Sequence, residues 1–339
     1  MINKALIEIP YLFRERVPVG DKRLSPKATP KKKQDPTSWP RATGLTEDIL
    51  RYGTWMREQA AEKIGHLYPQ VKITKDMVNK RPDLKPMLGQ ELTVIAYLWA
   101  RTVESPNPAY QGCHVPLVRS FTLSSKSGKS AWVEPIVDEK SYTFKVCVGE
   151  QAPEQEGTIG RKGGRCILSD SPIPLTYIRD QGKKGKLKQR LLAIVLEGNK
   201  KRIYLGPDRK LESNVEKIQR PVNIPNAKLP KNPRDFKTPN YGMTTFGSLF
   251  TPRQLVALTT FSDLVQEVKQ KVIRDALAAG WDDDGRGLEE GGEGATAYGD
   301  AVATYVALAV GRSTDYWSSL CSWNVPREQI SHVFTRQAI

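Results

Sequence analysis

The chain is poor in cysteine and histidine, with four of the former and three of the latter in 339 residues. Four scattered cysteines are too few for a disulfide framework, so we expect a reducing, cytoplasmic setting. A structural zinc site needs four thiolate or imidazole ligands in two close pairs. The sequence offers only Cys113, His114 and Cys166, with Cys147 remote from them. Side chains of adjacent residues diverge on a strand, so Cys113 and His114 are poor partners for one ion. The spacing alone therefore predicts no bound metal.

Long apolar runs are also missing. No apolar stretch approaches the roughly 20 residues that a membrane-spanning helix requires. The first apolar segment contains Glu8 and Arg14, which the apolar region of a signal peptide excludes. The sequence therefore predicts a protein without a membrane partner.

Recognisable catalytic motifs are scarce. Gly128-Lys129-Ser130 resembles the end of a phosphate-binding P-loop, but Leu123 stands where that loop needs a glycine. None of the three histidines lies near an obvious serine or cysteine nucleophile motif. Neither nucleotide binding at this loop nor nucleophilic catalysis is indicated.

Positive charge is abundant. Lys and Arg outnumber Asp and Glu by 52 to 37, which gives a net charge of +15. Residues 161–231 hold 18 Lys or Arg against 6 Asp or Glu, and so carry 12 of the excess positive charges. A basic enzyme surface is the plainer explanation, but this concentration favours nucleic acid as a partner. The candidate DNA-contacting residues are Arg161, Lys162, Arg165, Lys183, Lys184, Lys186, Lys188 and Arg190.

Hydrophobic patterns indicate both strands and helices. Residues 92–100 form a continuous apolar run, which predicts a strand buried on both faces, as in a parallel sheet. Residues 132–137 and 142–148 alternate as the two strands of a hairpin do. Thr251 and Gln254 form a capping box around Pro252, so a helix should begin there and continue to about residue 279.

These patterns divide the chain into three parts. We expect part of an α/β domain at 1–103, an inserted basic β-rich module at 104–230, and a helical region at 231–339 with an acidic, Gly-rich loop at 280–294.

Unusual strings recur along nearly the whole chain: INKALIEIP at 2–10, YGTWMR at 52–57, YLWARTV at 97–103, the block at 232–265, and SLCSW at 319–323. Together they resemble the large, zinc-ribbon-containing adenine-specific DNA methylases. The resemblance implies a partial Rossmann-like methyltransferase sheet, an inserted small β-rich module similar to a degenerate zinc ribbon, and a helical C-terminal part. It also implies S-adenosylmethionine as the cofactor of the full family enzyme.

The implied zinc ribbon has lost most of its ligands. The resemblance places one cysteine pair at Ser105 and Tyr110 and the other at Cys166 and Ser169, and only Cys166 is a cysteine. A serine hydroxyl does not replace a thiolate as a zinc ligand. We therefore expect the ribbon, if it forms, to lack its ion.

The catalytic motifs that the family would supply are missing from these residues. Neither its Gly-rich cofactor loop nor its Asp-Pro-Pro-Tyr motif occurs. Thr238-Pro239-Asn240-Tyr241 has threonine in place of the amine acceptor and asparagine in place of the second proline, so it is not a substitute. The expectation is a central fragment or subunit that contacts DNA. It would depend on the remaining methylase segments, as separate polypeptides, for cofactor binding and catalysis. The alternatives are a DNA-binding or assembly protein without a role in methylation, and a decayed remnant.

Overall fold

The computed structural model describes residues 3–25, 38–150, 156–199, 201–232 and 237–333. The fold is mixed α/β, and the chain forms two compact units. The helical unit comprises Met1–His66 and Leu255–Thr314, and the β-rich unit comprises Leu67–Gln254 and Asp315–Ile339.

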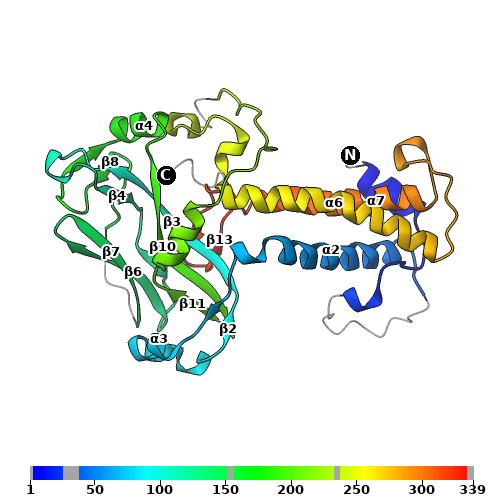
Figure 1. Cartoon of the computed structure of the whole chain (residues 1–339), viewed down its shortest axis with the longest axis horizontal. Helices are drawn as coiled ribbons and strands as arrows, with labels where there is room; N and C mark the ends of the chain where they lie inside the picture. The colour runs from blue at the N-terminus through cyan, green and yellow to red at the C-terminus, as the bar shows by residue number, and fades with distance from the viewer. Residues whose placement is uncertain (1–2, 26–37, 151–155, 200, 233–236, 334–339) are drawn as a thin grey trace. The chain divides into compact units, whose positions relative to one another are not determined.

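The helical unit packs around three long helices, which run alongside one another in Figure 1. Its elements are η1 (Lys4–Glu8), α1 (Ile9–Leu12), η2 (Lys22–Leu24), α2 (Thr43–Ile64), η3 (Gly65–Leu67), α6 (Pro252–Ala278), η8 (Leu288–Glu290) and α7 (Ala295–Ser313). Tyr52 of α2, Leu264 and Val268 of α6, and Tyr298 of α7 are fully buried in one apolar core. These helices owe their stability to this shared core, because in proteins most helical stability comes from tertiary packing of an apolar face.

The β-rich unit is built from antiparallel sheets that include a curled half-barrel. Its strands are β1 (Val71–Lys72), β2 (Glu91–Leu92), β3 (Val94–Glu104), β4 (His114–Leu117), β5 (Thr122–Ser124), β6 (Ser130–Asp138), β7 (Ser141–Gly149), β8 (Gly163–Arg165), β9 (Pro172–Pro174), β10 (Lys188–Gly198), β11 (Lys201–Leu205), β12 (Trp323–Asn324) and β13 (Gln329–Ile330). Its helical elements are α3 (Lys75–Lys80), η4 (Pro82–Met87), η5 (Pro108–Tyr110), α4 (Leu175–Lys183), α5 (Arg209–Glu216), η6 (Thr238–Tyr241) and η7 (Phe246–Leu249). The largest sheet has the order β11-β10-β3-β4, and β5-β6-β7 form a second sheet.

The prediction of a Rossmann-like sheet was wrong. No parallel sheet occurs in the described part of the chain, and β3 pairs antiparallel with both β10 and β4. The apolar run at 92–100 is continuous for a different reason. Ala96 and Ala100 face the β5-β6-β7 sheet, whereas Tyr97 and Trp99 face a second apolar cluster on the other side. Burial on both faces therefore does not require a parallel partner.

Several local predictions were confirmed. The hairpin forms from β6 and β7, which are paired from Ser130↔Gly149 to Asp138↔Ser141. The capping box also forms, because Gln254 N donates to Thr251 Oγ1 over 3.3 Å and Thr251 N donates to Gln254 Oε1 over 2.9 Å.

The acidic segment at 280–294 is tied to α7. Asp283 accepts hydrogen bonds from the backbone and hydroxyl of Thr296, over 3.0 and 2.7 Å. A carboxylate at this position also suits the positive end of the α7 dipole. Part of the charge in this segment therefore serves to begin the buried helix.

Candidate nucleic-acid interface

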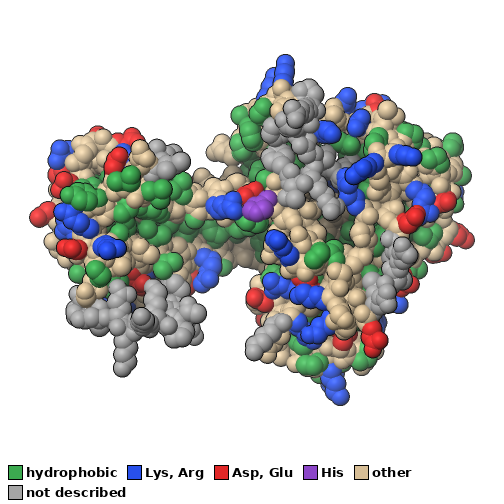
Figure 2. Space-filling model, turned by 180° about the vertical axis from the view of Figure 1, so that it is seen from behind, with side chains coloured by type: hydrophobic (Ala, Val, Ile, Leu, Met, Phe, Trp, Pro, Cys, Tyr) green, Lys and Arg blue, Asp and Glu red, His purple; other side chains and the backbone are tan. Residues whose placement is uncertain are grey.

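Lys and Arg side chains are scattered over the surface of the β-rich unit, and on the face drawn in Figure 2 they are not collected in one block. An exposed ion pair contributes little to stability, and a cation paired with a carboxylate is already partly neutralised. The useful distinction is therefore between cations that have an acidic partner and cations that have none.

Four of the predicted lysines follow one another at the end of α4. Lys183, Lys184, Lys186 and Lys188 are all exposed, and Gly185 has φ +67°, which allows the chain to turn into β10. Lys184 pairs with Asp180 over 2.7 Å across one helical turn. These four residues are named the lysine turn below. They present a dense row of cations to solvent.

The other predicted residues differ in their surroundings. Arg161 and Lys162 are exposed in the turn before β8, and Arg165 pairs with Asp170. Arg190 is held within the fold, because its Nε donates to the buried Glu212 over 2.9 Å. Arg190 also lies over the ring of Tyr142, 5.5 Å from its centroid. The eight residues thus fall into a group around β8, the lysine turn, and one arginine with an evident structural role.

Four further arginines, not predicted from the sequence, lie within the 238–254 loop or contact it. They come from separate parts of the chain, and no Asp or Glu of the described residues forms an ion pair with any of them: Arg101 in β3, Arg179 in α4, Arg220, and Arg253 in α6. The sequence did contain a signal for two of them, Arg220 and Arg253. Between residues 217 and 262 there are seven Lys or Arg and one acidic residue, Asp235, which lies outside the described residues.

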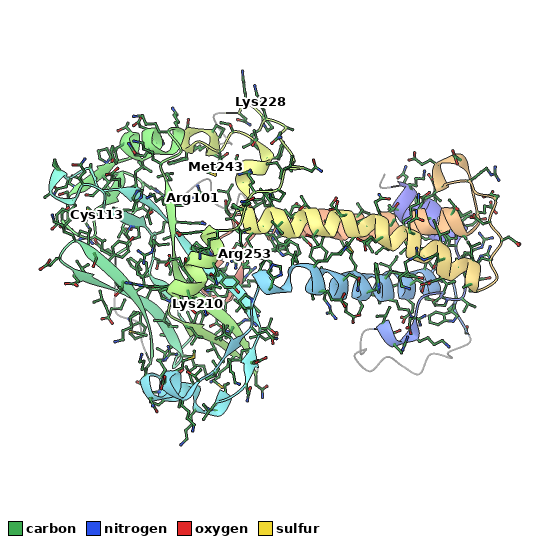
Figure 3. The ribbon with its side chains drawn as sticks, viewed as in Figure 1. Arg101, Cys113, Lys210, Lys228, Met243 and Arg253 are labelled. Atoms are coloured by element: carbon green, nitrogen blue, oxygen red, sulfur yellow. The ribbon has the colours of Figure 1, made fainter. Side chains whose placement is uncertain are left out.

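Arg101 is the most unusual of the four. Its Nη2 lies 3.3 Å from Met243 Sδ and 3.4 Å from Ser319 Oγ. Burial lowers the pKa of Arg101, because the surrounding protein disfavours the charged form. Figure 3 shows Arg101 and Met243 close to each other on one side of β3. A guanidinium in such surroundings is a candidate binding residue for an anion.

Arg253 is buried against aromatic rings. Its guanidinium lies 4.1 Å from the centroid of Tyr97 and 5.0 Å from that of Tyr68. Its Nη1 donates to Leu67 O over 3.3 Å. Cation–π contacts of this kind satisfy the charge in part without a carboxylate. Arg253 therefore adds positive potential near the start of α6.

The lysine turn and the 238–254 loop are neighbours. A Cβ on Gly182 would lie 2.8 Å from backbone atoms of Tyr241, and one on Gly242 would lie 2.1 Å from Gly182 O. Gly242 also has φ +87°, a conformation that favours glycine. Two glycines thus let α4 and the loop touch backbone to backbone, with Arg179 5.8 Å from the Tyr241 ring centroid.

The positions of the implied zinc ribbon do not form a zinc site. Cys166 is buried with its Sγ 3.4 Å from Ser105 Oγ. Cys113 instead donates to Lys140 O over 3.3 Å, and Thr102 Oγ1 lies 3.4 Å from His114 Nδ1. Across the described ranges, no three Cys, His, Asp or Glu side chains are grouped as metal ligands. One thiol and its serine neighbours do not fit a tetrahedral zinc ion.

Ser105, Cys166 and Ser169 nevertheless come together. Burial raises the pKa of the Cys166 thiol. Hydrogen bonds from the side chains of Ser105 and Ser169, and from the backbone N–H groups of Leu168 and Ser169, outweigh this effect and lower the pKa.

Replacing both Ser105 and Ser169 with cysteine should create, together with Cys166, a zinc site of three thiolates whose fourth position a water molecule would fill. Sulfur ligands around tetrahedral zinc lie about 3.8 Å apart, close to the present separation of Ser105 Oγ and Cys166 Sγ. The purified double variant should retain about one zinc per chain and should give thiolate absorption with Co²⁺, whereas the natural chain should do neither. Adding Cys113→Ser to the double variant is the control and should leave binding unchanged. A double variant that binds no more zinc than the natural chain would contradict this arrangement.

No protein-family model, curated protein or solved structure matches this chain. The methylase family therefore stays a prediction. None of the helices in the described ranges has the length and hydropathy that crossing a membrane requires.

Proposed function

We propose that this chain is a DNA-contacting portion of an adenine-specific DNA methyltransferase and is not catalytic on its own. The lysine turn carries the proposal, because four exposed cations on consecutive short segments have one carboxylate partner among them. Rows of exposed lysines contact DNA through its phosphates and without regard to base sequence. S-adenosylmethionine and the catalytic motif would then reside in other segments of the methylase, supplied as separate polypeptides.

A second candidate is a DNA-binding or assembly protein without a role in methylation. The antiparallel pairing of β3 favours it, because the methyltransferase sheet implied by the resemblance does not form from these residues. The two candidates share the lysine turn and differ in their protein partners.

Two measurements on the intact chain test the proposal. Fluorescence anisotropy with a labelled duplex should give an affinity that falls steeply between about 50 and 200 mM salt. Binding without salt dependence would contradict phosphate contact. Labelled S-adenosylmethionine should not bind the chain alone, and binding would refute the non-catalytic assignment.

Co-purification separates the two candidates. If the chain is a methylase portion, polypeptides with a Gly-rich cofactor loop and an Asp-Pro-Pro-Tyr motif should co-purify with it. Methylation should then appear only when the chain and these polypeptides are combined. DNA binding with no such partners would favour the second candidate.

A further inference from the structure

Arg101 lies on a strand that is otherwise suited to an apolar core. Tyr97 and Trp99 project from the same face of β3, since residues two apart in a strand share a face. Gln189 of β10 and Leu117 of β4 are directly opposite Arg101 in the sheet. Paired residues of antiparallel strands also share a face, so Gln189 and Arg101 project from the same face of the sheet. A cation at this position is costly unless something compensates for its lost hydration.

The protein itself offers little compensation. A guanidinium has five N–H donors, and the described residues give it one oxygen acceptor, Ser319 Oγ. That hydroxyl in turn donates to Leu249 O over 2.7 Å, so its position is fixed by the 246–249 turn. Met243 contributes only a thioether sulfur, which is a weak acceptor. Most of the hydrogen-bonding capacity of Arg101 is left for another molecule.

Arg101 is partly open to solvent and can be reached. Its environment is positive. Arg179 lies 5.8 Å from the ring centroid of Tyr241 in the 238–254 loop, and Arg253 lies over the ring of Tyr97. None of these three arginines forms an ion pair with an Asp or Glu of the described residues. The planar guanidinium fork matches two oxygens of a phosphate or carboxylate. The contact between Gly182 and Tyr241 connects this loop to the lysine turn. That continuity favours a backbone phosphate of a bound nucleic acid over a carboxylate.

We propose that Arg101 binds a phosphate of the DNA backbone, with Ser319 holding the guanidinium in place. This assignment rests on the proposed DNA contact and adds an internal anchor to the exposed lysines. It explains why an arginine without an acidic partner occupies the apolar face of β3. The lysine turn would attract the strand over a distance, and Arg101 would fix one phosphate at close range.

The test compares Arg101→Met with Arg209→Met in the intact chain. Arg209 begins α5 and is exposed, so its replacement makes the same change in net charge. Arg101→Met should weaken duplex binding about tenfold and should reduce the slope of log affinity against log salt by about 1. Thermal stability should be unchanged or higher, since an apolar side chain of similar volume replaces a partly desolvated charge. Arg209→Met should leave affinity almost unchanged.

A measurement with inorganic phosphate tests the Arg101 site independently of DNA binding. Phosphate should raise the melting temperature of the natural chain relative to chloride at equal ionic strength, and Arg101→Met should lose that shift. If the natural chain binds no duplex but keeps an Arg101-dependent phosphate shift, the phosphate site stands and the DNA contact is refuted. Duplex affinity and a phosphate shift that are unaffected by Arg101→Met would overturn the assignment.

Stabilisation by acetate but not phosphate would overturn it in favour of a carboxylate ligand. Arg101→Gln, which keeps polar atoms at this position, serves the same comparisons if the methionine variant does not fold.

Discussion

Replacing Asp48 with alanine should lower the free energy of unfolding of the helical unit by about 3–5 kcal/mol. Asp48 is fully buried and accepts hydrogen bonds from Val19 N, Gly20 N and the Tyr298 hydroxyl, over 2.9, 2.9 and 2.7 Å. Alanine would leave all three donors buried without an acceptor. Each unsatisfied buried donor costs about 1–3 kcal/mol, less whatever a trapped water recovers.

Urea denaturation followed by circular dichroism at 222 nm measures this effect, because the described elements of this unit are helical. Asp48→Asn keeps one acceptor oxygen, so it should lower the free energy of unfolding by about half as much as Asp48→Ala. Asp263→Ala is the matched control on an exposed position of α6 and should change stability by less than about 0.5 kcal/mol. Equal denaturation midpoints for Asp48→Ala and Asp263→Ala would contradict the structural role given to Asp48.

Local patterns predicted local structure well, as the β6–β7 hairpin and the α6 capping box demonstrate. Each depends on residues within a few positions of one another. The sheet could not be predicted in the same way. The β3 run is buried by segments distant in sequence, and an apolar run does not record whether its neighbours are parallel or antiparallel.

The candidate site illustrates the same limit. The lysine turn was evident from charge alone. The sequence could not show that Arg190, unlike these lysines, is bound within the fold, because its partner Glu212 is 22 positions away. Arg101 could not be predicted as a site residue for a related reason. Its significance comes from Met243 and Ser319, which are 142 and 218 positions away, and from the absence of an acidic partner among the described residues. Only folding brings these groups together.

Changing Lys183, Lys184, Lys186 and Lys188 together to alanine should reduce duplex affinity on the order of a hundredfold at low salt. A hundredfold loss corresponds to four exposed contacts that each contribute about 0.7 kcal/mol of binding free energy. The slope of log affinity against log salt should fall by about 3–4, because each neutralised phosphate contributes about 0.9. Stability should change little, since all four side chains are exposed.

The matched control replaces Lys72, Lys75, Lys80 and Lys85, four exposed lysines elsewhere in the β-rich unit. Both quadruple variants lower the net charge from +15 to +11, since each removes four positive charges. A long-range effect of net charge would weaken binding equally in the two, whereas direct contact at the lysine turn predicts a large loss in the first alone. Arg190→Ala adds a third comparison. It should destabilise the protein through Glu212 while leaving the salt slope intact, so that loss of fold and loss of contact are distinguished by separate readouts.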